Sequence, residues 1–192
     1  MKANKKFDYY DYAKKEGRWE LIDGEFYNMS PAPTNKHQWM CTRLWAELDS
    51  KLINCCECKP FVSPIDWVID MYNTVQPDVA IFCDKSEFFA NNFKSTPIFI
   101  AEIVSKSSVF KDKNIKYRLY EKSKVKYYLI VEPEYESADL FELIDDRYQF
   151  VKSIFHEDRY EFDILNQKIE IDFNSILQKI EEPQIDPNMN YI

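Results

Sequence analysis

The sequence predicts an α/β (mixed α+β) fold in which a mixed central sheet is flanked by helices. An apolar run at residues 97–104, interrupted only by one acid, predicts a strand buried on both faces. A helical pattern over residues 110–122 follows this strand, and a second apolar strand over residues 126–132 follows the helix. A strand–helix–strand order of this kind predicts a βαβ-like unit or a mixed core.

The N-terminal half combines a hairpin with a long helix. Asp23-Gly24 separates two apolar segments and is a strong signal for a two-residue β-turn. Apolar side chains at helical spacing between residues 36 and 53 predict an amphipathic helix. The other predicted elements are a helix at residues 7–15, hairpin strands at 18–22 and 25–29, a loop at 30–34, and strands at 65–70 and 75–83.

The C-terminal half is predicted to end in short strands and a helix. Residues 84–96 are polar and predict a loop with a short helix, and Asp145-Asp146-Arg147 predicts a hairpin turn. Asp172 is placed to cap a closing helix that runs through Lys179. Further strands are predicted at residues 140–144, 148–155 and 168–171, within one domain over residues 1–180 that precedes a flexible tail at 181–192.

Composition and charge limit the classes of function. The apolar fraction of 45% is typical of a folded core, and the presence of only two glycines excludes a Gly-rich phosphate-binding loop. No apolar run reaches the roughly 18 residues of a membrane span. The basic N-terminus is not followed by the apolar segment of a signal peptide. The sequence therefore predicts a cytoplasmic protein that has no membrane partner.

The net charge of −8 counts against an extended DNA-binding face, because phosphate contacts come from Lys and Arg. It leaves room for a local basic groove, since positive charge is concentrated between residues 106 and 126. The basic residues there are Lys106, Lys111, Lys113, Lys116, Arg118, Lys122, Lys124 and Lys126.

The five cysteines predict reduced thiols, because the count is odd and no export signal is present. His37, Cys41, Cys55 and Cys58 have the residue types of a zinc site. However, Cys41 and Cys55 would lie about 20 Å apart along one helix at 1.5 Å per residue. We therefore interpret the cysteines mainly as small buried side chains.

Glu102 and Asp78 are the candidate metal ligands. Glu102 lies in the apolar run, and Asp78 follows Pro77 at the head of another apolar strand. A buried carboxylate normally has a partner or binds a metal. Two carboxylates hold a hard cation such as Mg²⁺, with Mn²⁺ as a substitute, and such an ion activates water and polarises a phosphodiester.

A lysine from the following helix would complete this site. Lys113, Lys116 and Tyr120 lie at positions i, i+3 and i+7, so they share a helical face. A lysine there can position water or stabilise negative charge in the transition state. The set predicts metal-assisted phosphodiester hydrolysis. Structural alternatives stay open: Asp78 can cap a turn, Glu102 can pair with a core lysine, and Lys116 can pair with Asp112.

These residues resemble the Uma-two family, a branch of the PD-(D/E)XK nuclease superfamily with restriction-endonuclease-like members. The resemblance covers about residues 18–150 and implies a restriction-endonuclease-like sheet with Asp78 and Glu102 as metal ligands. The matching segments are Trp19 to Glu25, Met29 to Pro33 with His37, Gln76 to Ala80, Ala101 to Ser105 with Ser107-Ser108, Asp112 with Lys116 and Tyr120, and Val125 to Pro133.

The sequence departs from the superfamily pattern at two positions. Val104 stands where the usual lysine lies two residues after the second acid, and in this family a lysine that matches Lys116 substitutes for it. Tyr127 stands where relatives often have a glutamate. The resemblance also implies that Glu20 completes the acidic cluster, with an exposed strand residue as the alternative, and that His37 either supports the site or is structural.

The leading hypothesis is a Mg²⁺-dependent endonuclease that acts on DNA, with RNA as a further possible substrate. The alternative is a catalytically weak or inactive nuclease-like domain that binds nucleic acid or protein, which the acidic charge and Tyr127 favour. Restriction-type nucleases often pair to cut two strands, and the aromatic fraction of 16% suits an interface, so a homodimer is expected.

Overall fold

The computed structural model describes residues 6–30, 32–55, 57–106 and 108–178. Within them, the helical segments are α1 (Tyr9–Tyr12), α2 (Asn35–Leu52), η1 (Lys85–Glu87), η2 (Lys111–Lys116), α3 (Tyr117–Lys122) and α4 (Asn174–Leu177). The strands are β1 (Trp19–Ile22), β2 (Glu25–Asn28), β3 (Lys59–Val62), β4 (Trp67–Asp70), β5 (Asn73–Val75), β6 (Val79–Phe82), β7 (Phe99–Ile103), β8 (Tyr127–Glu132), β9 (Ser137–Ile144), β10 (Arg147–Ile154), β11 (Arg159–Ile164) and β12 (Gln167–Asp172).

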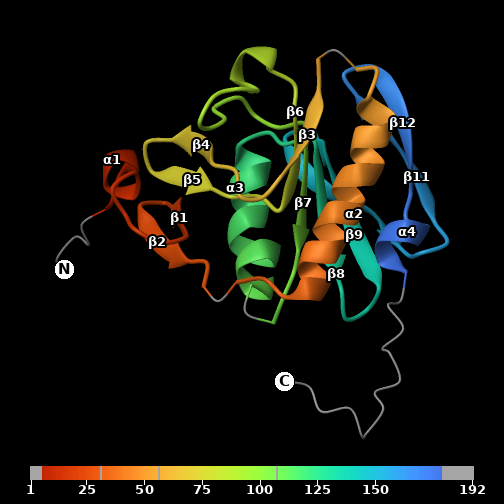
Figure 1. Cartoon of the computed structure of the whole chain (residues 1–192), viewed down its shortest axis with the longest axis horizontal. Coiled ribbons are helices and arrows are strands. Elements are labelled where there is room, and N and C mark those ends of the chain that lie inside the picture. The colour runs from red at the N-terminus through yellow and green to blue at the C-terminus, as the bar shows by residue number, and fades with distance from the viewer. Residues whose placement is uncertain (1–5, 31, 56, 107, 179–192) are drawn as a thin grey trace, which may run out of the picture.

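The central element is a six-stranded mixed sheet with the order β10-β9-β8-β7-β6-β3 (Figure 1). β7 and β8 are parallel, with Glu102 opposite Ile130, and η2 and α3 connect them. The other pairs in this sheet are antiparallel. The predicted βαβ unit and mixed fold class are therefore confirmed, and every residue of β7 is buried as expected.

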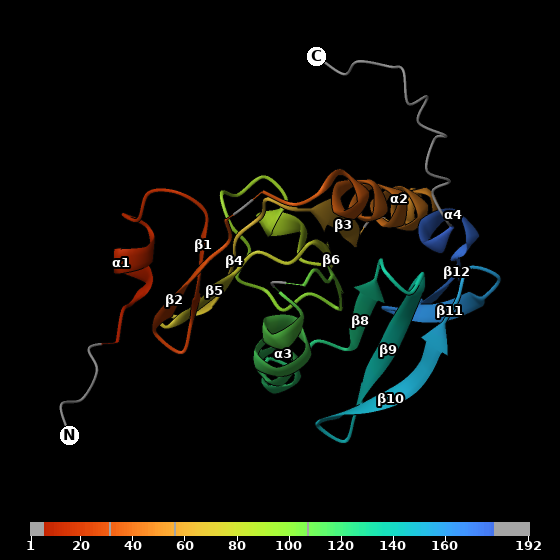
Figure 2. The same ribbon diagram turned by 90° about the horizontal axis from the view of Figure 1, so that it is seen from below.

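The two faces of this sheet carry different layers, which Figure 2 shows from below. One face packs against α2, α4 and the β11–β12 hairpin, and the side chains of Phe99, Ala101 and Ile103 in β7 point to this face. The other face packs against α3 and strands β4 and β5, and the side chain of Ile100 in β7 points to this face. Because side chains alternate along a strand, Glu102 points to the same side as Ile100, toward α3.

α2 forms where the apolar stripe predicted it. Thr34 caps its N-terminus by accepting a hydrogen bond from the His37 amide at 3.2 Å. The stripe is buried against the sheet, and each fully buried leucine contributes about 1.5–3 kcal/mol. Its buried members are Met40, Cys41, Leu44, Leu48 and Leu52. Their packing fixes the orientation of the first turns of α2, which carry His37.

Several local predictions hold and others need correction. Asp23 and Gly24 have φ angles of 52° and 79°, as the predicted two-residue turn requires. The expected strand at residues 75–83 is in fact two strands, β5 and β6, which belong to different sheets. The first helix is shorter than predicted, and α4 ends at Leu177. Lys179 and the predicted tail at 181–192 lie outside the described residues.

The expectation that all cysteines are reduced is wrong for one pair. Cys58 and Cys83 form a disulfide, because they extend the paired strands β3 and β6 by one residue and so face each other. Cys41 and Cys55 are free thiols. The disulfide also removes Cys58 from the four-ligand zinc set that its sequence position suggested.

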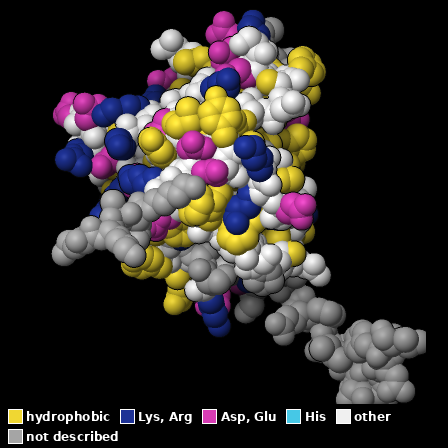
Figure 3. Space-filling model, turned by 90° about the vertical axis from the view of Figure 1, so that its left-hand side faces the viewer, with side chains coloured by type: hydrophobic (Ala, Val, Ile, Leu, Met, Phe, Trp, Pro, Cys, Tyr) yellow, Lys and Arg dark blue, Asp and Glu magenta, His cyan; other side chains and the backbone are white. Residues whose placement is uncertain are grey.

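The surface over the N-terminal side mixes charges of both signs. Figure 3 shows Lys and Arg side chains interspersed with Asp, Glu and apolar side chains on this face. Such a face offers no extended basic surface for nucleic acid. Among the described residues, no helix combines the length and apolar character that a bilayer span requires.

Candidate active site

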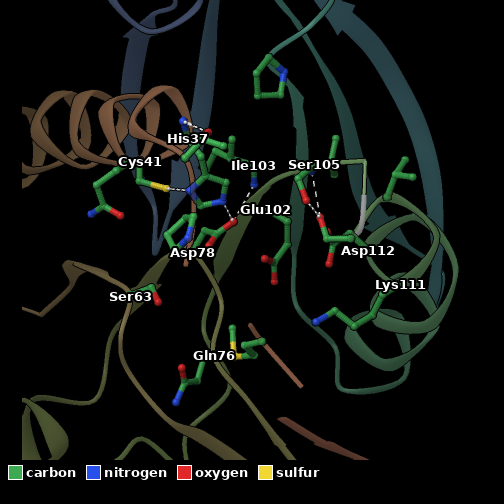
Figure 4. Close-up of a pocket in the computed structure, with 18 of the residues that line it drawn as sticks. His37, Cys41, Ser63, Gln76, Asp78, Glu102, Ile103, Ser105, Lys111 and Asp112 are labelled. Atoms are coloured by element: carbon green, nitrogen blue, oxygen red, sulfur yellow. Dashed lines mark hydrogen bonds and ion pairs between the residues drawn. The ribbon is translucent and has the colours of Figure 1, made fainter. Parts of the chain in front are cut away.

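Asp78 lies where the chain crosses from the small sheet to the large one, directly before β6. Its Oδ2 atom accepts hydrogen bonds from the Ile103 amide at 2.9 Å and from His37 Nε2 at 3.0 Å. The carboxylate is therefore held between β7 and the first turns of α2. Its side chain is 15% exposed, so it stays accessible from the adjoining cavity (Figure 4).

Glu102 is buried, with 2% of its surface exposed. Its Oε1 atom accepts hydrogen bonds from Lys116 Nζ at 2.9 Å and from the Tyr120 hydroxyl at 2.6 Å. Burial raises the pKa of Glu102 well above its ordinary value, and Asp78, Asp112 and Glu20 add to the rise while Lys116 opposes it. Burial is thus the main influence on this carboxyl group, and Lys116 is the charge that opposes it.

Lys116 lies among three buried carboxylates. Its Nζ atom is 2.7 Å from Glu20, 2.9 Å from Glu102 and 3.8 Å from Asp112. Burial alone would lower the pKa of this ammonium, but the three acids raise it well above its ordinary value. Lys116 therefore carries a positive charge, and the pairing with Asp112 is one part of a larger cluster.

Glu20 is completely buried, so the interpretation as an exposed strand residue is wrong. Its carboxylate accepts a hydrogen bond from the Gln76 amide at 3.1 Å. It also forms ion pairs with Lys111 at 2.6 Å and with Lys116 at 2.7 Å. Burial favours protonation, yet the two lysines outweigh it and lower the pKa of Glu20. Glu20 thus remains an anion that fixes two ammonium groups.

A π-helix explains how both lysines reach Glu20. η2 has six residues, and the Tyr117 amide donates to the Asp112 carbonyl five residues earlier. In this wider turn Lys111 and Lys116 share a face, whereas the α-helical spacing predicted that Lys113 would accompany Lys116. Lys113 instead pairs with Glu132 at 2.6 Å. Short π-segments of this kind often lie at functional sites.

His37 and Cys41 extend the cluster from α2. Cys41 Sγ lies 3.5 Å from His37 Nδ1, while the other ring nitrogen contacts Asp78. Burial raises the pKa of the Cys41 thiol, with Asp78 and Glu102 adding to the rise, so Cys41 is protonated. If Nδ1 accepts from this thiol and Nε2 donates to Asp78, the His37 ring satisfies all three groups.

These side chains, apart from Glu20, Lys113 and Tyr120, line one cavity of about 990 Å³. Asp78 and Glu102 lie beside each other at its wall, and Lys111 and Asp112 face them (Figure 4). Two carboxylates at the wall of one cavity are a chemically suitable donor set for a hard divalent cation. Lys111, Asp112 and Cys41 were not predicted as site residues. The i,i+4 spacing of His37 and Cys41 was the available signal for the cysteine.

Comparisons with known proteins identify the family and the fold of the chain. The family model Uma2, described as "Putative restriction endonuclease", matches residues 7–173. An uncharacterized protein from Synechocystis sp. is 25% identical over 163 residues, which are 83% of this chain and 84% of the relative.

The crystal structure of "a putative nuclease belonging to DUF820" from Anabaena variabilis shares the fold. Its TM-score is 0.71 at 12% identity, with 87% of this chain and 95% of that chain covered. The family match and the shared fold indicate a restriction-endonuclease-like nuclease, and the chain belongs to the Uma2 family.

Proposed function

We propose that the protein is a metal-dependent endonuclease that hydrolyses phosphodiester bonds in DNA. The observation that carries this proposal is the meeting of Asp78, Glu102 and Lys116 at one cavity. These side chains come from three different places in the fold, namely the residue before β6, the C-terminal part of β7 and the end of η2. A purely structural ion pair would need Lys116 and one acid, but it would not need an accessible second carboxylate.

Asp78 and Glu102 would hold Mg²⁺ or Mn²⁺, and the bound ion would supply Lewis acidity and an activated water. The chain itself supplies the positioning. The Ile103 amide and His37 orient Asp78, and Tyr120 orients Glu102 through a 2.6 Å hydrogen bond. These contacts restrict both carboxylates before any ligand arrives, which is the preorganisation that a catalytic site needs.

Lys116 takes the role that the superfamily assigns to the residue at Val104. The Val104 side chain packs in the core on the α3 side of the sheet, while the Lys116 ammonium lies 2.9 Å from Glu102. This places a permanent positive charge beside the carboxylate pair, where negative charge develops on a phosphate under attack. Lys111 adds a second ammonium at the cavity, and Glu20 fixes both.

Substrate binding must rely on local charge, because the net charge of the chain is −8. Arg18, Lys36 and Lys106 line the same cavity as the catalytic candidates. Cations at these positions suit contacts with the phosphates that flank a scissile bond. DNA binding by this small number of contacts should be weak at high salt.

The substitution at Tyr127 gives little support to an inactive domain. Tyr127 belongs to the core on the α2 side of the sheet, where its ring lies 5.1 Å from that of Phe162. Glu102 points to the opposite side, toward α3. An acid at position 127 would therefore start on the other face of the sheet, and its absence leaves the carboxylate cluster unchanged.

A cleavage assay tests the proposal. The purified protein is incubated with supercoiled plasmid, single-stranded DNA and RNA, in Mg²⁺, Mn²⁺ or EDTA, beside Glu102→Ala. We expect metal-dependent cleavage of DNA by the wild type and a loss of about 100-fold or more in the variant. Cleavage of none of these substrates with either metal, or equal cleavage by the variant, would contradict the proposal. Cleavage of RNA alone would contradict the assignment of DNA.

A further inference from the structure

A second group of metal-binding atoms overlaps the carboxylate pair. His37, Cys41 and Asp78 each offer one ligand atom, and these atoms lie within 4.8 Å of one another. His37 and Cys41 are four residues apart on α2, so they share a helical face. Asp78 is already bound to His37 at 3.0 Å. All three residues line the cavity that holds the candidate active site.

The chemistry of this group differs from that of the carboxylate pair. Imidazole nitrogen, thiolate sulfur and carboxylate oxygen together form a ligand set for Zn²⁺, whereas Mg²⁺ prefers oxygen ligands alone. Three protein ligands leave the fourth position of a tetrahedral ion open to the cavity. The group is also distinct from the zinc set that includes Cys55 and Cys58, since Cys58 is in a disulfide.

We propose that His37, Cys41 and Asp78 bind Zn²⁺, or a divalent ion of the same class, as an inhibitory site. Asp78 is the shared residue, because its carboxylate serves either the group on α2 or the pair with Glu102. Occupation by Zn²⁺ would therefore remove one of the two ligands that the hard cation needs. The three ligand residues alone support the binding of Zn²⁺. The inhibition also depends on the proposed nuclease function.

Binding at this site has a defined proton balance. Cys41 is a thiol in the metal-free protein, so the ion replaces its proton, which passes to solvent as the metal–sulfur bond forms. His37 coordinates through one ring nitrogen, and the hydrogen bond of that nitrogen is lost. No oxidant or reductant takes part. The buried position of Cys41, 2% exposed, limits the site to small ions that enter through the cavity.

Cobalt titration gives a test that does not depend on nuclease activity. Co²⁺ reports thiolate ligation by a charge-transfer absorption band, and Zn²⁺ added afterwards should displace it. The metal-free full-length protein is titrated beside Cys41→Ser, with Cys55→Ser as the matched control, because Cys55 is the other free thiol. We expect the band in the wild type and in Cys55→Ser. It should be absent in Cys41→Ser, with Co²⁺ affinity at least about tenfold weaker.

A wild type that shows no thiolate band, or a Cys41→Ser variant that retains it, would overturn the site. His37→Gln provides a second variant that keeps all thiols, and it should also weaken Co²⁺ binding by about tenfold or more. The inhibition is tested by the ratio of Mg²⁺-dependent cleavage with and without Zn²⁺. That ratio should fall in the wild type and stay near one in Cys41→Ser. A band without inhibition would overturn the competition for Asp78 and leave both the zinc site and the nuclease intact.

Discussion

Replacing Lys116 with methionine removes the positive charge that three buried carboxylates share while keeping a side chain of similar length. Lys116 is 2% exposed, and its contacts with Glu20 at 2.7 Å and Glu102 at 2.9 Å are those of a buried pair. Removing one partner from a buried ion pair typically costs 3–5 kcal/mol, because a buried charge is left without compensation. For a chain of this size the loss corresponds to a decrease in melting temperature of roughly 6–20 °C.

The loss should depend on pH. Burial is the main cause of the raised pKa of Glu102, and Lys116 opposes that rise, so the pKa increases further in the variant. A carboxyl group whose folded pKa is raised contributes stability below its ordinary value of 4.5, and this contribution disappears as the pH rises through the folded pKa. The deficit of Lys116→Met should thus be smallest at acidic pH and grow toward neutral pH.

Urea unfolding in EDTA at several pH values measures this deficit. The matched control is Lys113→Met, which removes a partly exposed lysine from the same π-helix and should cost about 0–1 kcal/mol. Equal stability of the two variants at neutral pH would refute the claim that Lys116 compensates the buried acids. A deficit that is the same at every pH would refute the role of carboxylate protonation.

Three further predictions concern the cavity, the core and the assembly. Lys111→Met should slow DNA cleavage by about 10–100-fold in a plasmid-nicking assay, while Lys113→Met stays near the wild type, because Lys111 lines the cavity and pairs with Glu20 whereas Lys113 pairs with Glu132. Equal rates for the two variants would contradict this. Tyr120→Phe should lose about 1.5–3 kcal/mol in urea unfolding, because its hydroxyl donates at 2.6 Å to a buried carboxyl group, and a loss below 0.5 kcal/mol would contradict that contribution. The chain should elute as a homodimer in size-exclusion chromatography with light scattering, and a monomer at every concentration tested would reject the dimer.

The buried acid at position 102 was predictable because an apolar run makes one carboxylate conspicuous. The crossover from β7 to β8 was predictable for a similar reason, since two apolar strands bracket a helical pattern. Lys116 and Tyr120, which both donate to Glu102, were predicted on the following helix, but the positions of Lys111 and Lys113 were harder to predict. Sequence spacing treats residues 110–122 as an α-helix, and nothing in the sequence marks the π-turn that moves Lys111 into the site and directs Lys113 to Glu132.

The missed strands have physical explanations. β3 contains Pro60, which argues against a strand, but β3 is an edge strand of the large sheet, where a missing N–H is tolerated. β12 matches the strand predicted at residues 168–171, but its partner β11 was missed. The two strands turn at Leu165 and Asn166, whose φ angles are 47° and 65°. That turn lacks the glycine on which hairpin prediction mainly relies. The Cys58–Cys83 disulfide depends on the pairing of β3 with β6, so it was not predictable before β3 was known.

Calorimetric titration with Mn²⁺ tests most directly whether Asp78 and Glu102 together hold one hard cation. The wild type is titrated beside Asp78→Asn and Glu102→Gln, which keep the shape of each side chain, and Lys113→Met serves as the control outside the cluster. We predict one Mn²⁺ per chain in the wild type and in the control, with affinity at least about tenfold weaker in each carboxamide variant. Unchanged affinity in either carboxamide variant would contradict a shared metal site between these two carboxylates.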